Sequence, residues 1–101
     1  MRETYPGYFS LESVLDLALE QSAVGKGKER HANDLPFIDQ PIMQISRQVG
    51  VGFPLGQAMK KAGESSGMLS RGEKEAAKRE LLGAIVYLAA AYIYIEEQKD
   101  D

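Results

Sequence analysis

The residues best suited to ligand chemistry lie in one short segment, Gly25-Lys26-Gly27-Lys28-Glu29-Arg30-His31. It holds three basic side chains and the chain's single histidine within seven residues. Backbone amides beside glycine, together with Lys and Arg side chains, are the donors that a phosphate or another polyanion requires. The segment differs from a Walker A motif, in which four residues separate the glycines and a Ser or Thr follows the Lys. It therefore predicts an anion site of another kind.

A second interpretation of this segment needs no ligand. Lysines that follow a helix stabilise the negative end of its dipole, and a connector between helices is often polar and rich in glycine. Both interpretations stay open on the sequence alone.

Other parts of the chain offer side chains that could complete a site for a phosphorylated, nucleotide-like ligand. Tyr5, Tyr8 and Phe9 surround Pro6-Gly7. Such rings stack on a nucleobase while nearby cations hold its phosphates, or they anchor an N-terminal arm on the helices or on a second copy. The candidate ligand-binding residues are Lys26, Lys28, Arg30, His31, Tyr8, Arg47 and Lys60.

The composition excludes several classes of function. With 101 residues, no Cys and one His, the chain is one small domain without a disulfide framework, a thiolate zinc site or a multi-histidine metal site. No Ser, Cys or carboxylate lies at a spacing from His31 that marks a nucleophilic triad. We therefore expect a non-enzymatic protein with no catalytic residue, no metal and no cofactor. Because the N-terminus lacks the apolar segment of a signal peptide, we expect a cytoplasmic location.

Charge separates into three blocks along the chain. Residues 1–23 and 62–101 each carry a net charge of −3, whereas residues 24–61 carry +3. An acidic protein repels nucleic acid over most of its surface, so we expect no nucleic-acid partner. The basic middle block remains suited to a small anion.

Helical periodicity appears in four segments, and strand alternation in none. Apolar spacings of three and four predict helices over residues 11–23, 41–49, 54–64 and 71–97. The expected start signals are Ser10 as an N-cap, Pro41 and Pro54 as first helical residues, and a capping box of Ser70 and Glu73.

These segments predict an all-α fold, a small helical bundle that forms one domain over residues 1–101. Its parts are an N-terminal arm (1–9), a polar basic loop (25–40) and a long C-terminal helix (71–97) for the core and an interface.

The long helix predicts self-association. Its residues 81–95 carry no charge on any face, and they span about 22 Å, which is short of the ~30 Å of a bilayer core. We therefore expect no membrane partner. Three short helices cannot cover such a helix on every side, so a second copy is expected to complete the bundle as a homo-oligomer. The expected interface is a seam with spacings of 4, 3, 4 and 3: Leu81, Ile85, Leu88, Tyr92 and Ile95.

The segment Glu80-Leu81-Leu82-Gly83-Ala84-Ile85-Val86-Tyr87-Leu88-Ala89 resembles the last helix of the MazG-type nucleotide pyrophosphohydrolases, an all-α family with a pattern such as ELGDxxxYL. The resemblance implies Mg²⁺ held by two carboxylates three residues apart and by a Glu pair on a facing helix. Here Gly83 takes the place of the second carboxylate, and no ExxE pair occurs on another predicted helix. We therefore carry over no metal ligand.

Three hypotheses for function follow. The first is a homo-oligomer that senses or sequesters a small phosphorylated, nucleotide-like ligand through its basic loop; small cysteine-free oligomers suit this role, in phage genomes among others. The second is a structural or regulatory interaction module that assembles through the C-terminal helix. The third is a pyrophosphohydrolase-like enzyme, which the missing carboxylate pairs disfavour.

Overall fold

The computed structural model describes residues 5–24 and 35–100, and in this part of the chain it contains helices and no strand. The predicted all-α fold is therefore confirmed. The elements in chain order are α1 (Phe9–Ala23), the short 3-10 helix η2 (Phe37–Asp39), α2 (Pro41–Val49), α3 (Gly52–Ser70) and α4 (Lys74–Glu97).

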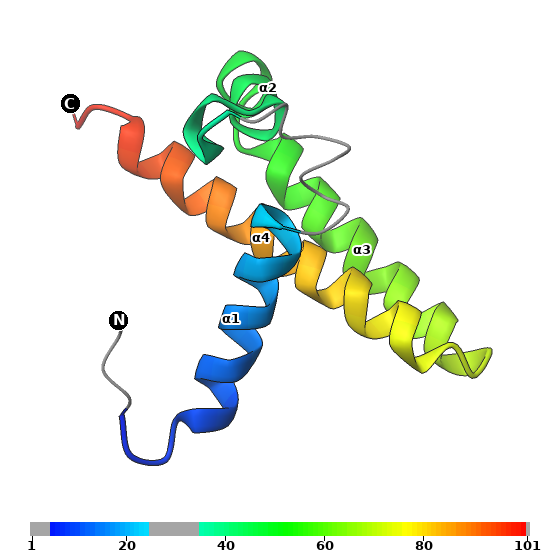
Figure 1. The fold of residues 1–101 in the computed structure, drawn as a ribbon. Coiled ribbons are helices and arrows are strands. Elements are labelled where there is room, and N and C mark those ends of the chain that lie inside the picture. Colours follow the sequence, from blue (N-terminus) through cyan, green and yellow to red (C-terminus); the bar gives the residue numbers. More distant parts are fainter. Residues whose placement is uncertain (1–4, 25–34, 101) are drawn as a thin grey trace.

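The hairpin of α3 and α4 is the frame of the molecule (Figure 1). Gly72 makes the turn between the two helices with a φ of 77°, a left-handed conformation that glycine adopts without strain. Ala77, Ala84 and Ala91 repeat every seven residues along α4 and are buried, as are Ala58 and Ser65 of α3. Such small side chains let the backbones of two helices approach closely.

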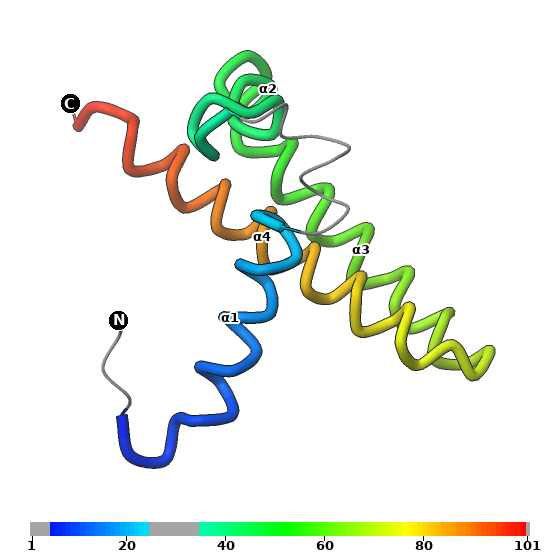
Figure 2. Tube along the Cα trace, viewed as in Figure 1, coloured from blue at the N-terminus to red at the C-terminus, as the bar shows by residue number. Residues whose placement is uncertain are grey.

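The two remaining helices pack on this hairpin at different places. α2 lies at the end of the hairpin where α3 begins, and it contacts both α3 and α4. Among the described helices, α1 packs extensively on α4 alone, and it crosses α4 near the middle of α4 (Figure 2). The first half of α1 extends away from the other helices, and Ala18 is the residue that α1 buries. The chain therefore has an open arrangement of helices.

The predicted helix bounds hold for residues 41–49 and need correction elsewhere. α1 begins at Phe9, because Gly7 closes a turn in which the Tyr8 amide donates to the Tyr5 carbonyl and the helix starts at once. Ser10 is thus inside the helix, and the predicted N-cap there is wrong.

α3 is longer than predicted at both ends. It begins at Gly52 and continues through Gly63 and Gly67 to Ser70, although glycine is a poor helix former. Packing along α4 outweighs that propensity, because tertiary contacts supply most of the stability of a helix in a protein. Ser70 consequently ends α3, and the predicted capping box is absent; Glu73 is the residue before α4 and receives a hydrogen bond from Arg71 instead.

Candidate functional site

Four of the predicted ligand-binding residues, Lys26, Lys28, Arg30 and His31, lie outside the described residues. The other three are described. Tyr8 is exposed just before α1, Arg47 is in the last turn of α2, and Lys60 is exposed on α3.

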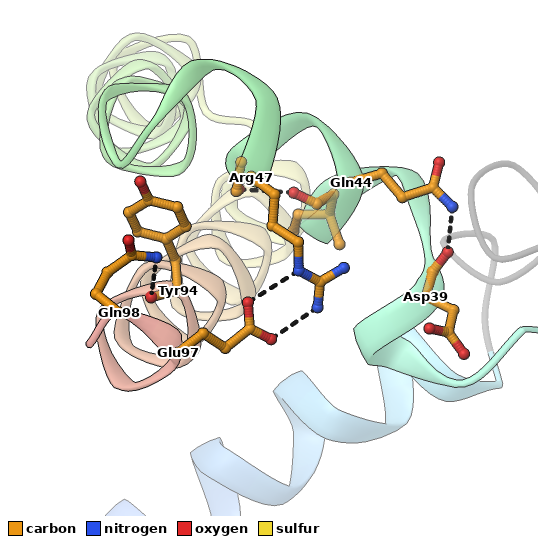
Figure 3. A network of polar contacts seen from close by, with 8 residues as sticks. Asp39, Gln44, Arg47, Tyr94, Glu97 and Gln98 are labelled. Atoms are coloured by element: carbon orange, nitrogen blue, oxygen red, sulfur yellow. Dashed lines mark hydrogen bonds and ion pairs between the residues drawn. The ribbon is translucent and has the colours of Figure 1, made fainter.

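Arg47 is engaged by a carboxylate (Figure 3). Its Nε donates to Oε1 of Glu97 at 2.8 Å, and its Nη2 donates to Oε2 at 2.7 Å. The hydrogen bonds to Glu97 raise the pKa of Arg47, and those from Arg47 lower the pKa of Glu97. Such a two-point contact ties the end of α2 to the end of α4. A phosphate that bound Arg47 through Nε and Nη2 would have to displace Glu97.

The three described candidates do not come together within one chain. Tyr8 precedes the projecting end of α1, whereas Lys60 is on α3, and these two helices lie on opposite sides of α4 in Figure 1.

Four residues of the predicted seam of α4 are exposed to solvent. The exposed fractions of Leu81, Leu88, Tyr92 and Ile95 are 46%, 51%, 69% and 61%. Each is a large apolar side chain, and none of the described helices covers this side of α4. The small residues Ala84, Ala90 and Ala91 of α4 are buried within the chain.

The remaining residue of the predicted seam, Ile85, lines an apolar groove of about 760 Å³. The groove lies between α1, α4 and the segment that begins at Leu35. The walls are mostly aliphatic, with Leu15 and Leu19 from α1 and Val86 and Ile93 from α4. Gln40 is a polar residue in the wall, and its Nε2 donates to the carbonyl oxygen of Leu35 at 2.9 Å. The groove offers burial for apolar groups, and none of the described residues that line it is a cation for a phosphate.

The sequence analysis missed a polar and aromatic cluster between α3 and α4. The Nζ of Lys61 lies 5.9 Å from the ring centroid of Tyr87 and 3.7 Å from Oε2 of Glu80. Phe53 meets the Tyr87 ring edge-on at 5.9 Å. Gly83 leaves room for the Lys61 side chain, because a Cβ there would lie 3.1 Å from its Cδ. Glu80 thus pairs with a lysine at the place where the resemblance implied a metal ligand.

No group of three or more His, Cys, Asp or Glu side chains in residues 5–24 and 35–100 is arranged to hold a metal ion. Among the described helices, none combines the length and the apolarity needed to cross a membrane. No protein-family model, no curated protein and no solved structure matches this chain.

Proposed function

We propose that this chain is a non-enzymatic helical homo-oligomer that binds a small phosphorylated, nucleotide-like ligand. The observation that carries the proposal is the exposed seam of α4, since Leu81, Leu88, Tyr92 and Ile95 form an uncharged row on the surface. Large apolar rows on a protein surface mark interfaces.

The dimensions of the chain also support self-association. Its accessible surface is 7542 Å². A compact monomer of 11.1 kDa would expose about 5,700 Å², so the excess is about 1,900 Å². Stable interfaces cover about 800 Å² per partner, and obligate ones cover more. The excess is therefore of the size that an obligate oligomer buries.

A second copy would also cover the apolar face of α1. Leu11, Leu15 and Leu19 repeat every four residues and are all exposed. Among the described helices, α1 packs extensively on α4 alone and buries one alanine, and such a helix needs further packing to be stable.

The ligand half of the proposal rests on the basic segment 25–31 and on Tyr8. Tyr8 is exposed next to α1, where its ring is open to stack on a base. The segment with Lys26, Lys28 and Arg30 follows the other end of the same helix in sequence. Ligand binding is thus assigned to the surroundings of α1, and no cofactor is involved.

The assembly is tested by light scattering on the protein and on its Leu88→Glu variant. Leu88 is half exposed, so the variant should fold, and the buried charge should at least halve the mass of the assembly. Gln48→Glu, an exposed change on α2, is the control and should keep the mass. A monomer at micromolar concentration for the unchanged protein would contradict the proposal.

Ligand binding is tested by a thermal-shift screen of nucleotides and phosphorylated metabolites. A ligand at about 100 times its Kd stabilises the folded protein by about 2.7 kcal/mol. The variant with both Lys26→Ala and Arg30→Ala should weaken binding of a hit by tenfold or more, because charge-assisted hydrogen bonds contribute about 1.5–3 kcal/mol each. Lys99→Ala is a matched control.

The second candidate function is an interaction module that only assembles. The pairing of Arg47 favours it, because Glu97 accepts hydrogen bonds from its Nε and Nη2 and makes this side chain less available to an anion. A folded Lys26→Ala, Arg30→Ala variant with unchanged affinity, or a screen without a hit, would favour this candidate.

A further inference from the structure

α1 carries a row of three exposed leucines. Leu11, Leu15 and Leu19 are 52%, 40% and 65% exposed and follow one another at intervals of four residues. Residues four apart form one of the ridges through which helices pack on one another. At about 100° per residue, Leu11 and Leu19 lie about 40° to either side of Leu15 around the helix axis. The row is therefore symmetric about Leu15.

The two sides of this row have different surroundings. Ala18, the residue that α1 buries where it crosses α4, lies about 60° to one side of Leu15. The acidic residues Glu12, Asp16 and Glu20 lie about 60°, 100° and 140° to the other side. A helix that packed on the leucine row would thus also approach α4, and the carboxylates would stay at the border of the contact or beyond it.

The two halves of α1 complement each other. The first half, with Leu11, extends away from the other helices (Figure 2). The second half, with Leu15 and Leu19, forms one wall of the apolar groove, and α4 and the segment that begins at Leu35 form the others. Each chain thus has a projecting apolar segment and an apolar groove beside the same helix.

The rest of the chain holds little that could fill this groove. Residues 1–4, 25–34 and 101 contain Met1 and Ala32 as their only apolar side chains. The open chain also exposes about 1,900 Å² more than a compact monomer of its mass, and a stable interface covers about 800 Å² per partner. This area is large enough for a second copy to cover both the groove and the seam of α4.

Antiparallel pairing of α1 with its copy would use both halves of the helix. With a two-fold axis at Leu15, Leu11 of each chain lies opposite Leu19 of the other, and the projecting half of each α1 lies beside the groove of the other chain. Both α4 helices then lie on one side of the α1 pair, and both acidic faces lie on the other side. A surface that matches itself under a two-fold rotation is the requirement for an isologous interface.

We propose that the first half of α1 binds at the groove between α1 and α4 of a second copy, in an antiparallel pair centred on Leu15. The proposal rests on the self-association in the proposed function, and it names the segment that carries this contact. The seam of α4 adds to the same assembly but is not required for the α1 pair.

Disulfide formation tests the centre of the pair, because the chain has no cysteine of its own. Helix axes about 8–10 Å apart bring facing Cα atoms, each about 2.3 Å from its axis, to about 3.4–5.4 Å, and a disulfide joins Cα atoms about 4.4–6.8 Å apart. Leu15→Cys should therefore form a covalent dimer on mild oxidation, which a nonreducing gel detects. Leu17→Cys is the matched control, because Leu17 is also exposed but lies about 160° away around α1. Equal cross-linking of the two variants would overturn the α1 pair.

A mixture of two variants tests the direction of the pair. When Leu11→Cys and Leu19→Cys are refolded together, they should form covalent dimers. Each variant alone should cross-link slowly, because its two cysteines are about 12 Å apart along an antiparallel pair. A parallel pair gives the reverse, with fast cross-linking of each variant alone, and that result would overturn the antiparallel arrangement.

Light scattering on the unchanged protein and on Leu15→Glu separates this inference from the proposed function. Leu15 is partly exposed, so the variant should fold, which circular dichroism checks. Two carboxylates at the two-fold axis should weaken the pair by about a hundredfold or more and lower the mass of the assembly. Gln48→Glu is the control that should keep the mass.

The outcomes of this comparison are distinct. If the unchanged protein is an oligomer and folded Leu15→Glu has the same mass, the α1 pair is overturned and the proposed self-association stands. If Leu15→Glu lowers the mass and Leu88→Glu does not, the α1 pair stands and the seam of α4 is wrong. A monomeric unchanged protein would overturn both.

Discussion

Arg47 joins the end of α2 to the end of α4 through its two hydrogen bonds to Glu97. Both side chains are about one-third exposed, so water and salt weaken this pair. Its role is to hold the last turn of α4 in register with α2. The sequence pattern could not reveal this, because the two residues are 50 positions apart.

Replacement of Glu97 should make the stability less sensitive to acid. Since Arg47 lowers the pKa of Glu97 from its ordinary value of 4.5, the pair stabilises the fold above that pH, and its contribution is lost as the pH falls through the lower pKa of the folded state. Glu97→Gln should therefore melt below the unchanged protein at pH 7 and converge with it in acid. Thermal melts from pH 7 to pH 2 measure this, with Glu96→Gln as the control. If the melting temperatures of Glu97→Gln and the unchanged protein run parallel from pH 7 to pH 2, the ion pair has no role in the acid dependence of stability.

Deprotonation of Tyr87 should account for part of the loss of stability at alkaline pH. Burial raises the pKa of this phenol above 10.0, so the folded chain holds its proton where an unfolded chain loses it. Stability is thus intact below about pH 10 and falls as the pH rises from there toward the pKa of the folded state. Tyr87→Phe keeps the ring contact with Phe53 and should remove this part of the loss. Denaturant melts between pH 8 and 11 measure this. The free energies of unfolding of Tyr87→Phe and the unchanged protein should diverge only at the upper end of this range, and the exposed Tyr92→Phe is the control.

At the scale of elements, the α3–α4 hairpin depends on small residues. The row Ala77, Ala84 and Ala91 is buried within the chain itself. Periodicity marks such positions as apolar, but it does not say which neighbour covers them.

A larger side chain at the middle residue of this row should force α3 and α4 apart. Ala84 is 7% exposed, so Ala84→Leu must force the two helices apart and should cost about 1–3 kcal/mol of unfolding free energy. Urea unfolding measures the change. Ala89→Leu, at an exposed position beside the groove, should cost little because the groove has room for a larger side chain. Equal effects of the two variants would argue against close packing along the row.

The class of fold and most of the helices could be predicted from the sequence. Apolar periodicity and a proline at the start of a helix, such as Pro41, are local signals that do not depend on distant contacts. It failed where tertiary contacts decide the outcome. The third helix was predicted to end at residue 64, but packing on α4 keeps α3 helical through Gly67 to Ser70. The seam of α4 stays a prediction as an interface, and two of its residues, Leu88 and Tyr92, are exposed. The Lys61–Glu80 pair could have been suggested only by knowledge of the hairpin.

At the scale of the whole molecule, the chain is more open than its length requires. Its radius of gyration is 14.7 Å, against about 13 Å for a compact domain of this size. The projecting half of α1 and the uncovered face of α4 account for this shape (Figure 1). If copies cover these faces, folding and assembly are one equilibrium rather than two.

Coupled folding and assembly should make the melting temperature depend on protein concentration. Unfolding of an oligomer releases separate chains, so dilution favours the unfolded state by mass action. For a chain of this length we expect the melting temperature to rise by roughly 3–5 °C for each tenfold increase in concentration. Calorimetry over about a hundredfold range of concentration measures this. Leu88→Glu should melt at a lower temperature than the unchanged protein at every concentration. The control Gln48→Glu should have the same melting temperatures as the unchanged protein. A melting temperature that does not change with concentration would mean that the exposed rows on α1 and α4 stay uncovered during folding, and that the stability of this open chain comes from the α3–α4 hairpin alone.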